Sequence, residues 1–494
     1  MLLKHLTRRH LRTDLLCAFL LSSMLALAAC GGGGGGDAAG GGGGSGPGPG
    51  PGPGPVEIPS PPLPPRPDPH WSADPVRIDD RSAAGDAGHP TLAAGPNGNV
   101  AAAWTQVHNG RVGIHGGIYD AATASWSEPV PLDDPEAGDA GRPALAVDSR
   151  GNVTAMWSQA NGPGTSTVYA RRYDAAQKRW GASEQVRTAI GAQLPVLVVD
   201  GADNLTAAWL EREPFSALRV VSSRFDQGLW SAPVPVSSSD TFGAFGDPVL
   251  AVHGSGRIVA VWMDQPLTGT AAVTINASQF DGAQWSVPVR IDMQMDLAPG
   301  DFSYAIWPAL VADGLGHVVA AWAQTDLTVD FVASSRFDGE AWSAPTPIGT
   351  GSSAPVRLGA DAAGNVTAIW DEYTPDSVHH LSSSRFSALD GQWSPPVKIT
   401  RDGGVAQAAT FSLAAQADGD LFAVWTGFTS RSTILASRYV AATDSWDRPQ
   451  QIDAPAATGN ASSPVVMVDA AGGATAVWVQ RQDGRAVINS NRFE

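Results

Sequence analysis

Apolar and polar residues alternate over short runs through most of this chain, and one such run recurs in near copies. Its clearest copy, residues 142–157, reads R-P-A-L-A-V-D-S-R-G-N-V-T-A-M-W. In this run Val153, Ala155 and Trp157 fall on one face by the period-two rule of a half-buried β-strand. Similar runs return about every 53 residues, and a repeat period of this size is typical of blade or solenoid arrays.

Tryptophans mark the repeat in two series that alternate strictly. The first series closes the second expected strand of each unit and comprises Trp104, Trp157, Trp209, Trp262, Trp322, Trp370, Trp425 and Trp478. The second series opens the fourth expected strand and comprises Trp71, Trp126, Trp180, Trp230, Trp285, Trp342, Trp393 and Trp446. Residues 71–494 therefore divide into eight units, and Trp307 is the one tryptophan that falls outside both series.

Each unit contains four short apolar runs separated by turn residues, which predicts four β-strands. Between the first and second runs lies D-x-x-G or a near variant, in which Asp caps a tight turn and Gly takes a positive φ. Proline within a sheet is confined mainly to an edge, and the fourth run contains one at Pro129, Pro233, Pro288 and Pro345. The fourth strand is therefore expected outermost, and the small residues of the first strand suit the crowded centre of a ring.

The two ends of the chain complete each other. Glu494 follows directly on N-S-N-R-F, the third strand of the eighth unit, and residues 71–78 have the pattern of its missing fourth strand. We therefore predict an all-β fold over residues 70–494, an eight-bladed β-propeller of four-stranded antiparallel blades. In this fold the N-terminal strand completes the last blade and closes the ring, which an open solenoid would not need.

Residues 1–29 have the pattern of a secretory signal peptide, with basic residues, a short apolar run and a small-residue cleavage site. The apolar run is too short to span a membrane comfortably. The tetrapeptide L-A-A-C at residues 27–30 resembles a bacterial lipobox, which implies that Cys30 becomes the lipid-modified first residue of the mature protein. Gly31 follows instead of Asp, which in lipoproteins implies the outer membrane rather than the inner one. We expect a cell-envelope protein that is periplasmic or surface-exposed and held to the membrane by its lipid anchor only.

Residues 30–69 comprise the lipidated Cys and a linker rich in Gly and Pro, which we expect to act as a spacer. Cys17 lies in the removed segment and Cys30 is acylated, so no thiol is left for a disulfide. Removal of residues 1–29 takes away four basic residues and one acidic residue, which leaves 27 and 47 and a net charge of −20. An acidic surface repels phosphate groups, so nucleic acid and direct contact with anionic headgroups are poor candidates.

The hairpin between the third and fourth strands resembles the Asp-box, S/T-x-D-x-G-x-x-W, of the sialidase-like propellers. In residues 278–285 and 335–342 the serine-to-tryptophan spacing and the glycine match, but the aspartate stands one position late. The resemblance implies a propeller fold and little chemistry. Sialidase activity would require three arginines, a Tyr–Glu pair and an acid on one face, yet the F-R-I-P segment of that family is absent. A glycoside hydrolase or lyase of this class is the alternative to a binding function.

A second resemblance is to propeller lectins, which bind sugars between blades with a repeated Arg and an aromatic platform. The third strand carries an arginine before its aromatic residue in six units, at Arg172, Arg224, Arg336, Arg385, Arg438 and Arg492. Repetition suits a multivalent lectin. It suits better a structural role in which each arginine ties its blade to carbonyls or to an Asp of the neighbouring blade.

Loops on a rigid scaffold tend to carry function, so departures from the repeat are of interest. The loops after the second and fourth strands share one face, which is acidic and predicts cationic or neutral hydroxylated partners. Its carboxylates are Asp80, Asp86, Asp134, Glu136, Asp139, Glu211, Glu213, Asp247, Asp264, Asp296, Asp301, Asp326, Asp330, Asp371 and Glu372.

The largest departure is residues 293–308, where the spacing between the two tryptophan series rises to 37 from a usual 28 to 33. Aromatic rings beside carboxylates make a platform for a sugar or a peptide. The candidate ligand-binding residues are Asp301, Phe302, Tyr304, Trp307, Asp326, Asp371 and Glu372. The alternative is that the insertion folds over the central channel and buries its rings.

The sequence contains no H-E-x-x-H, EF-hand, phosphate-cradling or G-x-S-x-G motif. We therefore expect no catalytic residue, no bound metal and no cofactor. The sequence favours a surface-tethered, non-enzymatic propeller that recognises a glycan or a protein partner at the cell envelope through its acidic loop face.

Overall fold

The computed structural model describes residues 70–83, 85–212, 216–237, 242–266, 272–294, 303–326, 328–351, 354–373, 379–400, 405–428, 431–453 and 459–494. These residues form β-strands and connections, with one turn of 3-10 helix at Ala441–Thr443. The signal peptide, Cys30 and the linker that we predict lie outside the described residues. Within the described ranges no helix is long and apolar enough to cross a membrane.

The strands follow the predicted units in chain order. The first unit contains β2 (Ala87–Ala94), β3 (Val100–His108), β4 (Arg111–Asp120), β5 (Ser125–Trp126) and β6 (Val130–Pro131). The second and third units contain β7 (Ala144–Val147), β8 (Val153–Gly162), β9 (Thr165–Asp174), β10 (Arg179–Val199), β11 (Leu205–Arg212), β12 (Arg219–Asp226), β13 (Leu229–Trp230) and β14 (Val234–Pro235). The fourth unit contains β15 (Phe242–Val252), β16 (Ile258–Pro266), β17 (Thr274–Phe280) and β18 (Val289–Arg290).

The remaining units repeat this layout. The fifth unit contains β19 (Ala305–Ala312), β20 (Val318–Thr325), β21 (Asp330–Phe337) and β22 (Thr346–Thr350). The sixth contains β23 (Arg357–Ala360), β24 (Val366–Tyr373), β25 (His379–Ser387), β26 (Gln392–Trp393) and β27 (Val397–Lys398). The seventh contains β28 (Val405–Ala415), β29 (Leu421–Phe428), β30 (Ser432–Val440), β31 (Ser445–Trp446) and β32 (Gln450–Gln451). The eighth contains β33 (Ala461–Val468), β34 (Ala474–Gln482), β35 (Arg485–Phe493) and the N-terminal β1 (Val76–Arg77).

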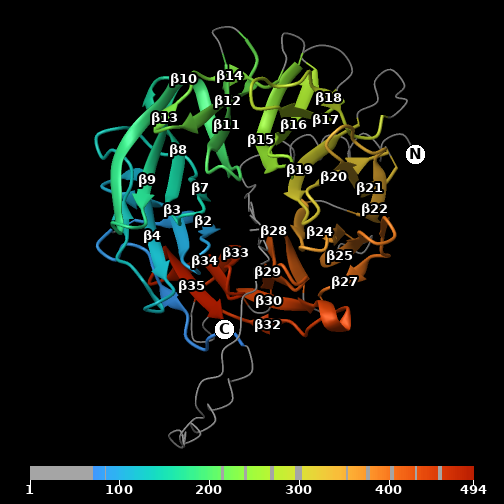
Figure 1. Ribbon diagram of the computed structural model, residues 1–494. Helices are drawn as coiled ribbons and strands as arrows, with labels where there is room; N and C mark the ends of the chain where they lie inside the picture. Colours follow the sequence, from blue (N-terminus) through green and yellow to red (C-terminus); the bar gives the residue numbers. More distant parts are fainter. Residues whose placement is uncertain are drawn as a thin grey trace, which may run out of the picture.

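These strands pair into seven antiparallel sheets within the described residues. Within each unit the strands lie in order from first to fourth, as in β19-β20-β21-β22. Strand β10 belongs to two units, because its first part pairs with β9 and its last part with β11, which joins the second and third units into one eight-stranded sheet. Figure 1 shows the sheets side by side around a common centre, with first strands such as β7 and β28 innermost and short strands such as β27 and β32 at the rim.

The two ends of the chain meet in one sheet. Strand β1 pairs with β35, with Val76 opposite Ser490, and the His70 N–H donates to the Glu494 carbonyl at 3.0 Å. The ring of Trp71 lies 5.6 Å from that of Phe493. Residues of the first and eighth units also share one buried cluster. Strand β1 therefore lies at the edge of the sheet that β33, β34 and β35 form.

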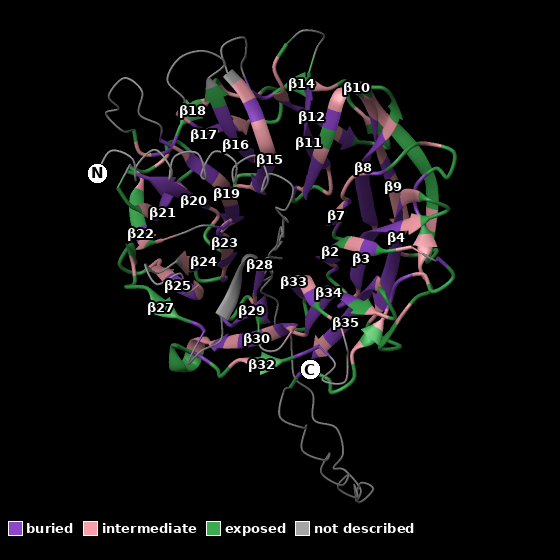
Figure 2. Ribbon diagram, turned by 180° about the vertical axis from the view of Figure 1, so that it is seen from behind, coloured by how far each residue is buried: buried purple, intermediate pink, exposed green. Residues whose placement is uncertain are grey.

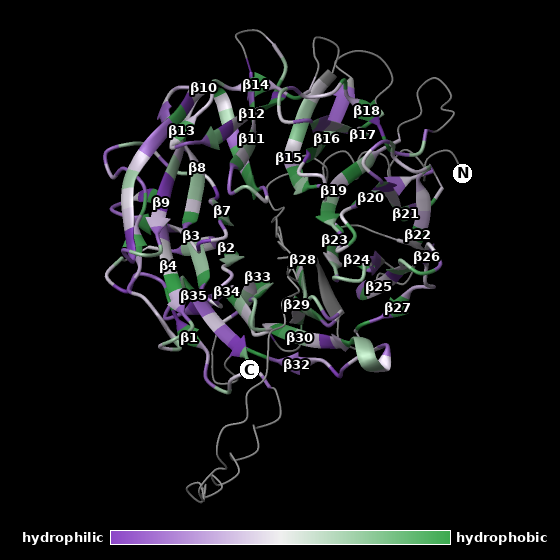
Figure 3. Ribbon diagram, viewed as in Figure 1, coloured by the Kyte–Doolittle hydropathy of each residue, from purple (hydrophilic) through white to green (hydrophobic). Residues whose placement is uncertain are grey.

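The second-strand tryptophans are the largest side chains of the core, and all eight are 0 or 1% exposed. Each lies in a buried cluster that contains residues of its own unit and of an adjacent unit. Figure 2 shows second strands such as β8 coloured mainly as buried. In six units the indole N–H donates to the residue two positions later, at 2.9 to 3.2 Å, and these acceptors are Gln106, Gln159, Glu211, Asp264, Gln324 and Gln480. A buried donor without an acceptor would cost about 1 to 3 kcal/mol, so this pairing makes the burial favourable. Figure 3 shows the corresponding contrast between apolar strands and hydrophilic outer connections, for example around β32.

The tryptophans of the second series pack on the aromatic residue that ends the third strand. The ring centroids lie 5.2 to 5.7 Å apart in all eight units, from Tyr119 and Trp126 to Phe493 and Trp71. Tilted or edge-on aromatic pairs of this kind are favourable beyond the area that they bury. The hairpin that resembles an Asp-box is thus a structural element, and its aspartates, such as Asp281, accept backbone N–H groups of the turn.

The repeated arginines link neighbouring units, though not as the sequence suggests. Each arginine pairs with the Asp of its own unit, as Arg336 does with Asp313 at 2.8 Å, rather than with an Asp of the neighbour. Each also lies over the aromatic ring of the following unit, as Arg336 does over Phe386 at 5.4 Å. The other five pairs are Arg172–Asp148, Arg224–Asp200, Arg385–Asp361, Arg438–Asp420 and Arg492–Asp469. These arginines hold the units together, which supports their structural role.

Replacement of Trp71 tests whether the N-terminal strand stabilises the fold. In Trp71→Ala the contacts with Phe493 and Phe422 are lost, and loss of a buried tryptophan costs about 3 to 5 kcal/mol. We expect a lower thermal unfolding midpoint by circular dichroism, and no change in the control Val287→Ala, whose side chain is exposed. An unchanged midpoint in Trp71→Ala would show that the strand does not contribute to stability.

Candidate functional site

The predicted aromatic platform is described only in part, because Asp301 and Phe302 lie outside the described residues. Tyr304 is half-buried, and its hydroxyl donates to Asp330 Oδ1 at 2.6 Å. Its carbonyl accepts from the Thr325 N–H at 3.1 Å. Tyr304 therefore joins the connection that precedes β19 to the loop between β20 and β21, so these two loops share a face.

Trp307 lies inside strand β19 and not in a loop. Its backbone φ is 56°, and its N–H donates to the Met263 sulfur at 3.2 Å. The ring is partly buried against a cluster of the fourth and fifth units that includes Ile275 and Trp322. The interpretation that this segment buries its rings thus holds in part for Trp307.

The three remaining candidate carboxylates have structural partners. Asp326 accepts hydrogen bonds from the Thr328 hydroxyl and from two backbone N–H groups, which hold the pKa of Asp326 below its usual range. Asp371 is buried and contacts His379 Nδ1 at 2.7 Å. Glu372 accepts a hydrogen bond from the Ser382 hydroxyl at 2.6 Å. It follows Asp371 directly in β24, so the two side chains face opposite sides of the sheet.

Other carboxylates of the predicted acidic face also serve the scaffold. Asp139 accepts the Val112 N–H at 2.8 Å, and Asp86 accepts the Ala486 N–H at 2.7 Å. Glu211 and Asp264 are the indole acceptors named above. Because these charges are held by hydrogen bonds at fixed positions, fewer of them are available to a partner than the sequence count indicates.

A more specific set of positions lies within or just before the first strands, where a proline recurs in seven of the eight units. We call the residue before this proline the central position of its unit. The central positions are His89, Arg142, Leu194, Asp247, Trp307, Ala354 and Ser463. Trp307 therefore falls outside both tryptophan series but occupies this other repeated position. Its signal was present in the sequence as W-P-A-L beside R-P-A-L, but tryptophan spacing does not reveal it.

Five central positions lie at irregularities of the strand pairing, between β2 and β3, β10 and β11, β15 and β16, β19 and β20, and β33 and β34. Four of these residues have a positive φ of 48 to 56°, namely His89, Leu194, Trp307 and Ser463. Such a φ is unusual for a side chain other than Gly and is found often at functional sites. Bulges redirect a side chain, so these five units each direct a different residue out of an otherwise uniform strand.

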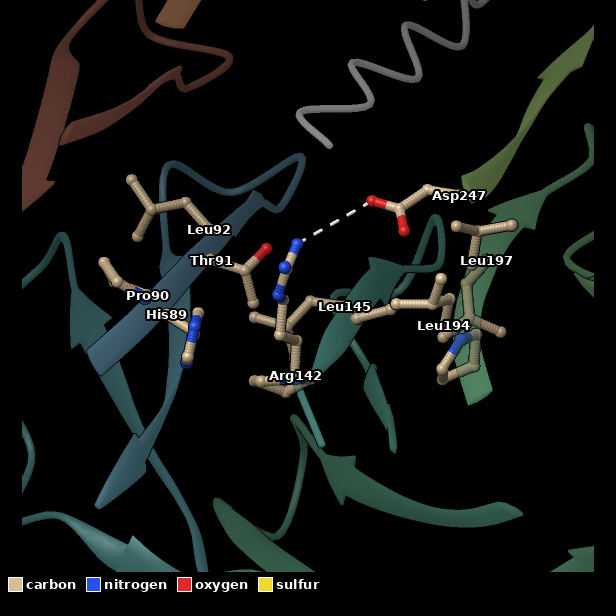
Figure 4. Close-up of a pocket in the computed structure, with 13 residues that line it drawn as sticks. His89, Pro90, Thr91, Leu92, Arg142, Leu145, Leu194, Leu197 and Asp247 are labelled. Carbon is tan, nitrogen blue, oxygen red and sulfur yellow. Dashed lines mark ion pairs between the residues drawn. The ribbon is translucent and has the colours of Figure 1, made fainter. Parts of the chain in front are cut away.

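Four central positions line one cavity of about 70 Å³ at the inner strands, namely His89, Arg142, Leu194 and Asp247. Figure 4 shows the guanidinium of Arg142 directed at the carboxylate of Asp247, and the two groups approach to 3.8 Å. The side chains of Arg142 and Asp247 are 19 and 15% exposed, so both are mostly buried but reachable. The second and fourth units thus place one charge pair at the centre.

Burial dominates the electrostatics of this pair. It raises the pKa of Asp247 to about 6, although Arg142 and Arg357 both act to lower it. Burial likewise lowers the pKa of Arg357 to about 10, opposed by Asp247. Asp247 therefore changes its charge near neutral pH, between two cations that come from different units.

His89 completes the polar lining of the cavity. The Thr105 hydroxyl donates its hydrogen to the Gly88 carbonyl at 2.9 Å. His89 Nδ1 lies 3.2 Å from the Thr105 hydroxyl oxygen, so Nδ1 must be the donor in this second hydrogen bond. Burial, then the charge of Arg142, lowers the pKa of His89. His89 is therefore neutral at pH 7, with Nε2 as an acceptor.

No protein-family model matches this chain, and no curated protein sequence does. Solved structures that are similar to it include the BP39L lectin from Burkholderia pseudomallei, with 14% identity, 74% of this chain and 98% of the lectin covered, and a TM-score of 0.49. A polysaccharide lyase, Uly1, has 10% identity, 71% and 89% coverage and a TM-score of 0.47. The Hadza microbial sialidase Hz136 has 14% identity, 68% and 76% coverage and a TM-score of 0.40. Similarity at this level identifies no ligand, so function rests on the site itself.

Replacement of Asp264 tests its structural role. Burial raises its pKa to about 6, so between pH 4 and 6 the folded state binds more protons than the unfolded state, and stability falls as pH rises. In Asp264→Asn the amide oxygen still accepts the Trp262 indole N–H but carries no charge. We expect a gain of about 2 kcal/mol at pH 8 and little change at pH 4, measured by denaturant unfolding. An equal effect at both pH values would contradict the role of the buried charge.

Proposed function

We propose that this chain is an eight-bladed β-propeller, closed by strand β1, that binds a glycan without chemical change at the mouth of its central channel. The blade count is supported by eight repeated units, two of which share strand β10. Closure is supported by the pairing of β1 with β35 and by the Arg492–Tyr119 contact at 4.4 Å between the eighth and first units.

The observation that carries the binding function is the Arg142–Asp247 pair at the central positions. A sugar presents neighbouring hydroxyls that both donate and accept hydrogen bonds. Asp247 and His89 Nε2 can accept from such hydroxyls, and Arg142 can donate to them. The cavity is smaller than the roughly 300 to 1,000 Å³ of a pocket that encloses a ligand. It therefore takes one protruding group of a glycan, whose remaining residues lie over the loop face.

Recognition without hydrolysis is favoured by the number of carboxylates. Glycoside hydrolysis commonly uses two of them, at separations of about 5 to 10 Å. Among the described residues that line this cavity, Asp247 is the only carboxylate. The second candidate is a lyase or hydrolase, which is favoured by the pKa of Asp247 near 6 and by the neutral His89, since both suit proton transfer at neutral pH.

The cellular setting of this proposal follows from the N-terminal pattern. A lipid on Cys30 would hold the chain to the outer membrane, and the Gly/Pro-rich linker would separate the propeller from the bilayer. The glycan is then one of the cell envelope or of its surroundings.

Binding is tested with a glycan panel and isothermal titration on the full chain, with product release from the same glycans followed in parallel. Asp247→Asn and Arg142→Met each remove a charged partner, so we expect about a tenfold loss of affinity or more. Asp281→Asn is the control, since this carboxylate lies in the outer hairpin of the fourth unit, away from the cavity and from the loop face. Equal affinities in all variants would contradict the site, whereas cleaved products would favour the enzymatic candidate. Binding of no glycan would favour a protein partner.

Affinity should also depend on pH. Asp247 accepts hydroxyl hydrogen bonds best when ionised, which requires a pH above its pKa of about 6. We therefore expect affinity to rise between pH 5 and 7 in the wild type and to stay flat in Asp247→Asn. A wild-type affinity that falls over this range would contradict the role of the ionised carboxylate.

A further inference from the structure

Strand β10 presents a long outer edge that the other units lack. Residues 179–190 pair with β9, and among the described residues no strand pairs with their other side before Ile190. In the part of the chain that the structure describes, the other outermost strands contain two to five residues. Figure 2 shows the outer part of β10 at the rim, coloured as exposed and intermediate.

The proline that interrupts the outer strands is missing here. It stands three residues after the outer tryptophan in six of the other seven units, and Ser183 takes its place after Trp180. After Trp71, the remaining outer tryptophan, Pro75 stands four residues later instead of three. Proline on an edge removes a donor and blocks pairing with another chain. The edge of β10 is therefore both longer than the others and unblocked.

A bulge in β10 brings two opposite charges onto one face. Glu184 is opposite Ala170 and Arg187 is opposite Val168, with a shift of register between them. Ala170 and Val168 are two residues apart in β9 and so share a face, which places Glu184 and Arg187 on the same face as well. Without the bulge, residues three apart would face opposite sides of the sheet.

The charges of one β10 strand are complementary to those of a second β10 strand that runs antiparallel to it. When two copies of β10 pair about a twofold axis between Gln185 and Val186, Glu184 of each copy stands opposite Arg187 of the other. Arg187 already contacts Glu211 at 3.2 Å, but its side chain is 37% exposed and a guanidinium has five N–H donors. It can therefore bridge the buried Glu211 and the second carboxylate.

We propose that β10 is a homodimerisation edge, at which a second copy of this chain adds its own β10 in antiparallel orientation. The twofold axis makes every contact occur twice, as in an isologous interface. The eight-stranded sheets of the two copies become one continuous sheet. A second copy is favoured over an unrelated peptide because Glu184 and Arg187 are matched by the same strand. The proposal does not depend on glycan binding.

The test is sedimentation velocity over a range of concentrations, on the full chain with Cys30→Ser to remove the predicted lipid. We expect the wild type to form dimers. Ser183→Pro restores the missing proline, and Glu184→Arg places two arginines opposite each other, so each should raise the dimer dissociation constant about tenfold or more. The effect of Glu184→Arg should shrink from about 0.05 M to about 0.5 M NaCl, because salt screens the repulsion. Circular dichroism confirms that each variant is folded.

Glu128→Arg is the matched control, an identical charge reversal two residues after the outer tryptophan of the first unit, and it should leave the dimer unchanged. Gln185→Cys, next to the twofold axis, should form a disulfide-linked dimer, whereas Gln177→Cys at an exposed turn should not. A wild type that is monomeric at every concentration overturns the proposal. So does a dimer that Ser183→Pro and Glu184→Arg leave intact.

Discussion

The fold depends on burial of the second-strand tryptophan between neighbouring units. A four-stranded sheet with apolar residues on both faces cannot bury them alone, so each unit needs the next. The indole N–H would make this burial costly if it had no acceptor, and a polar residue two positions later supplies one in six units. The sixth unit solves the problem differently, because Trp370 donates to the Thr350 carbonyl. The need for a neighbour also explains why the N-terminal strand is paired with the C-terminal one.

The arginine links show how the scaffold adapts when a part is missing. Two units lack both members of the Arg–Asp pair: the first has Ile118 and Gly95, and the fourth has Gln279 and His253 in their places. A buried Asp without its arginine would be an uncompensated charge, so the two are lost together. In the fourth unit Arg257 instead donates to the Gly339 carbonyl of the next unit at 2.8 Å. The joint loss of the arginine and the aspartate in these two units indicates that the arginines have a structural role.

Function is expected where this constancy ends. The central positions carry a histidine, an arginine, a leucine, an aspartate and a tryptophan on strands that otherwise resemble one another. The outer edge of β10 is the second such place, because it alone lacks the edge proline altogether. Loop carboxylates are a poorer guide, since Asp326 and Asp139 hold the turns and strands around them.

The sequence by itself determined the strands, their order from centre to rim and the buried tryptophans, because period-two patterning, turn residues and edge prolines are local signals. It also indicated that residues 71–78 complete the last unit. Tertiary structure decided which varied side chains meet, since Arg142 and Asp247 belong to units that are not adjacent in the chain. It also decided their chemistry, because the pKa of Asp247 depends on burial and on arginines from two other units, which no local pattern encodes.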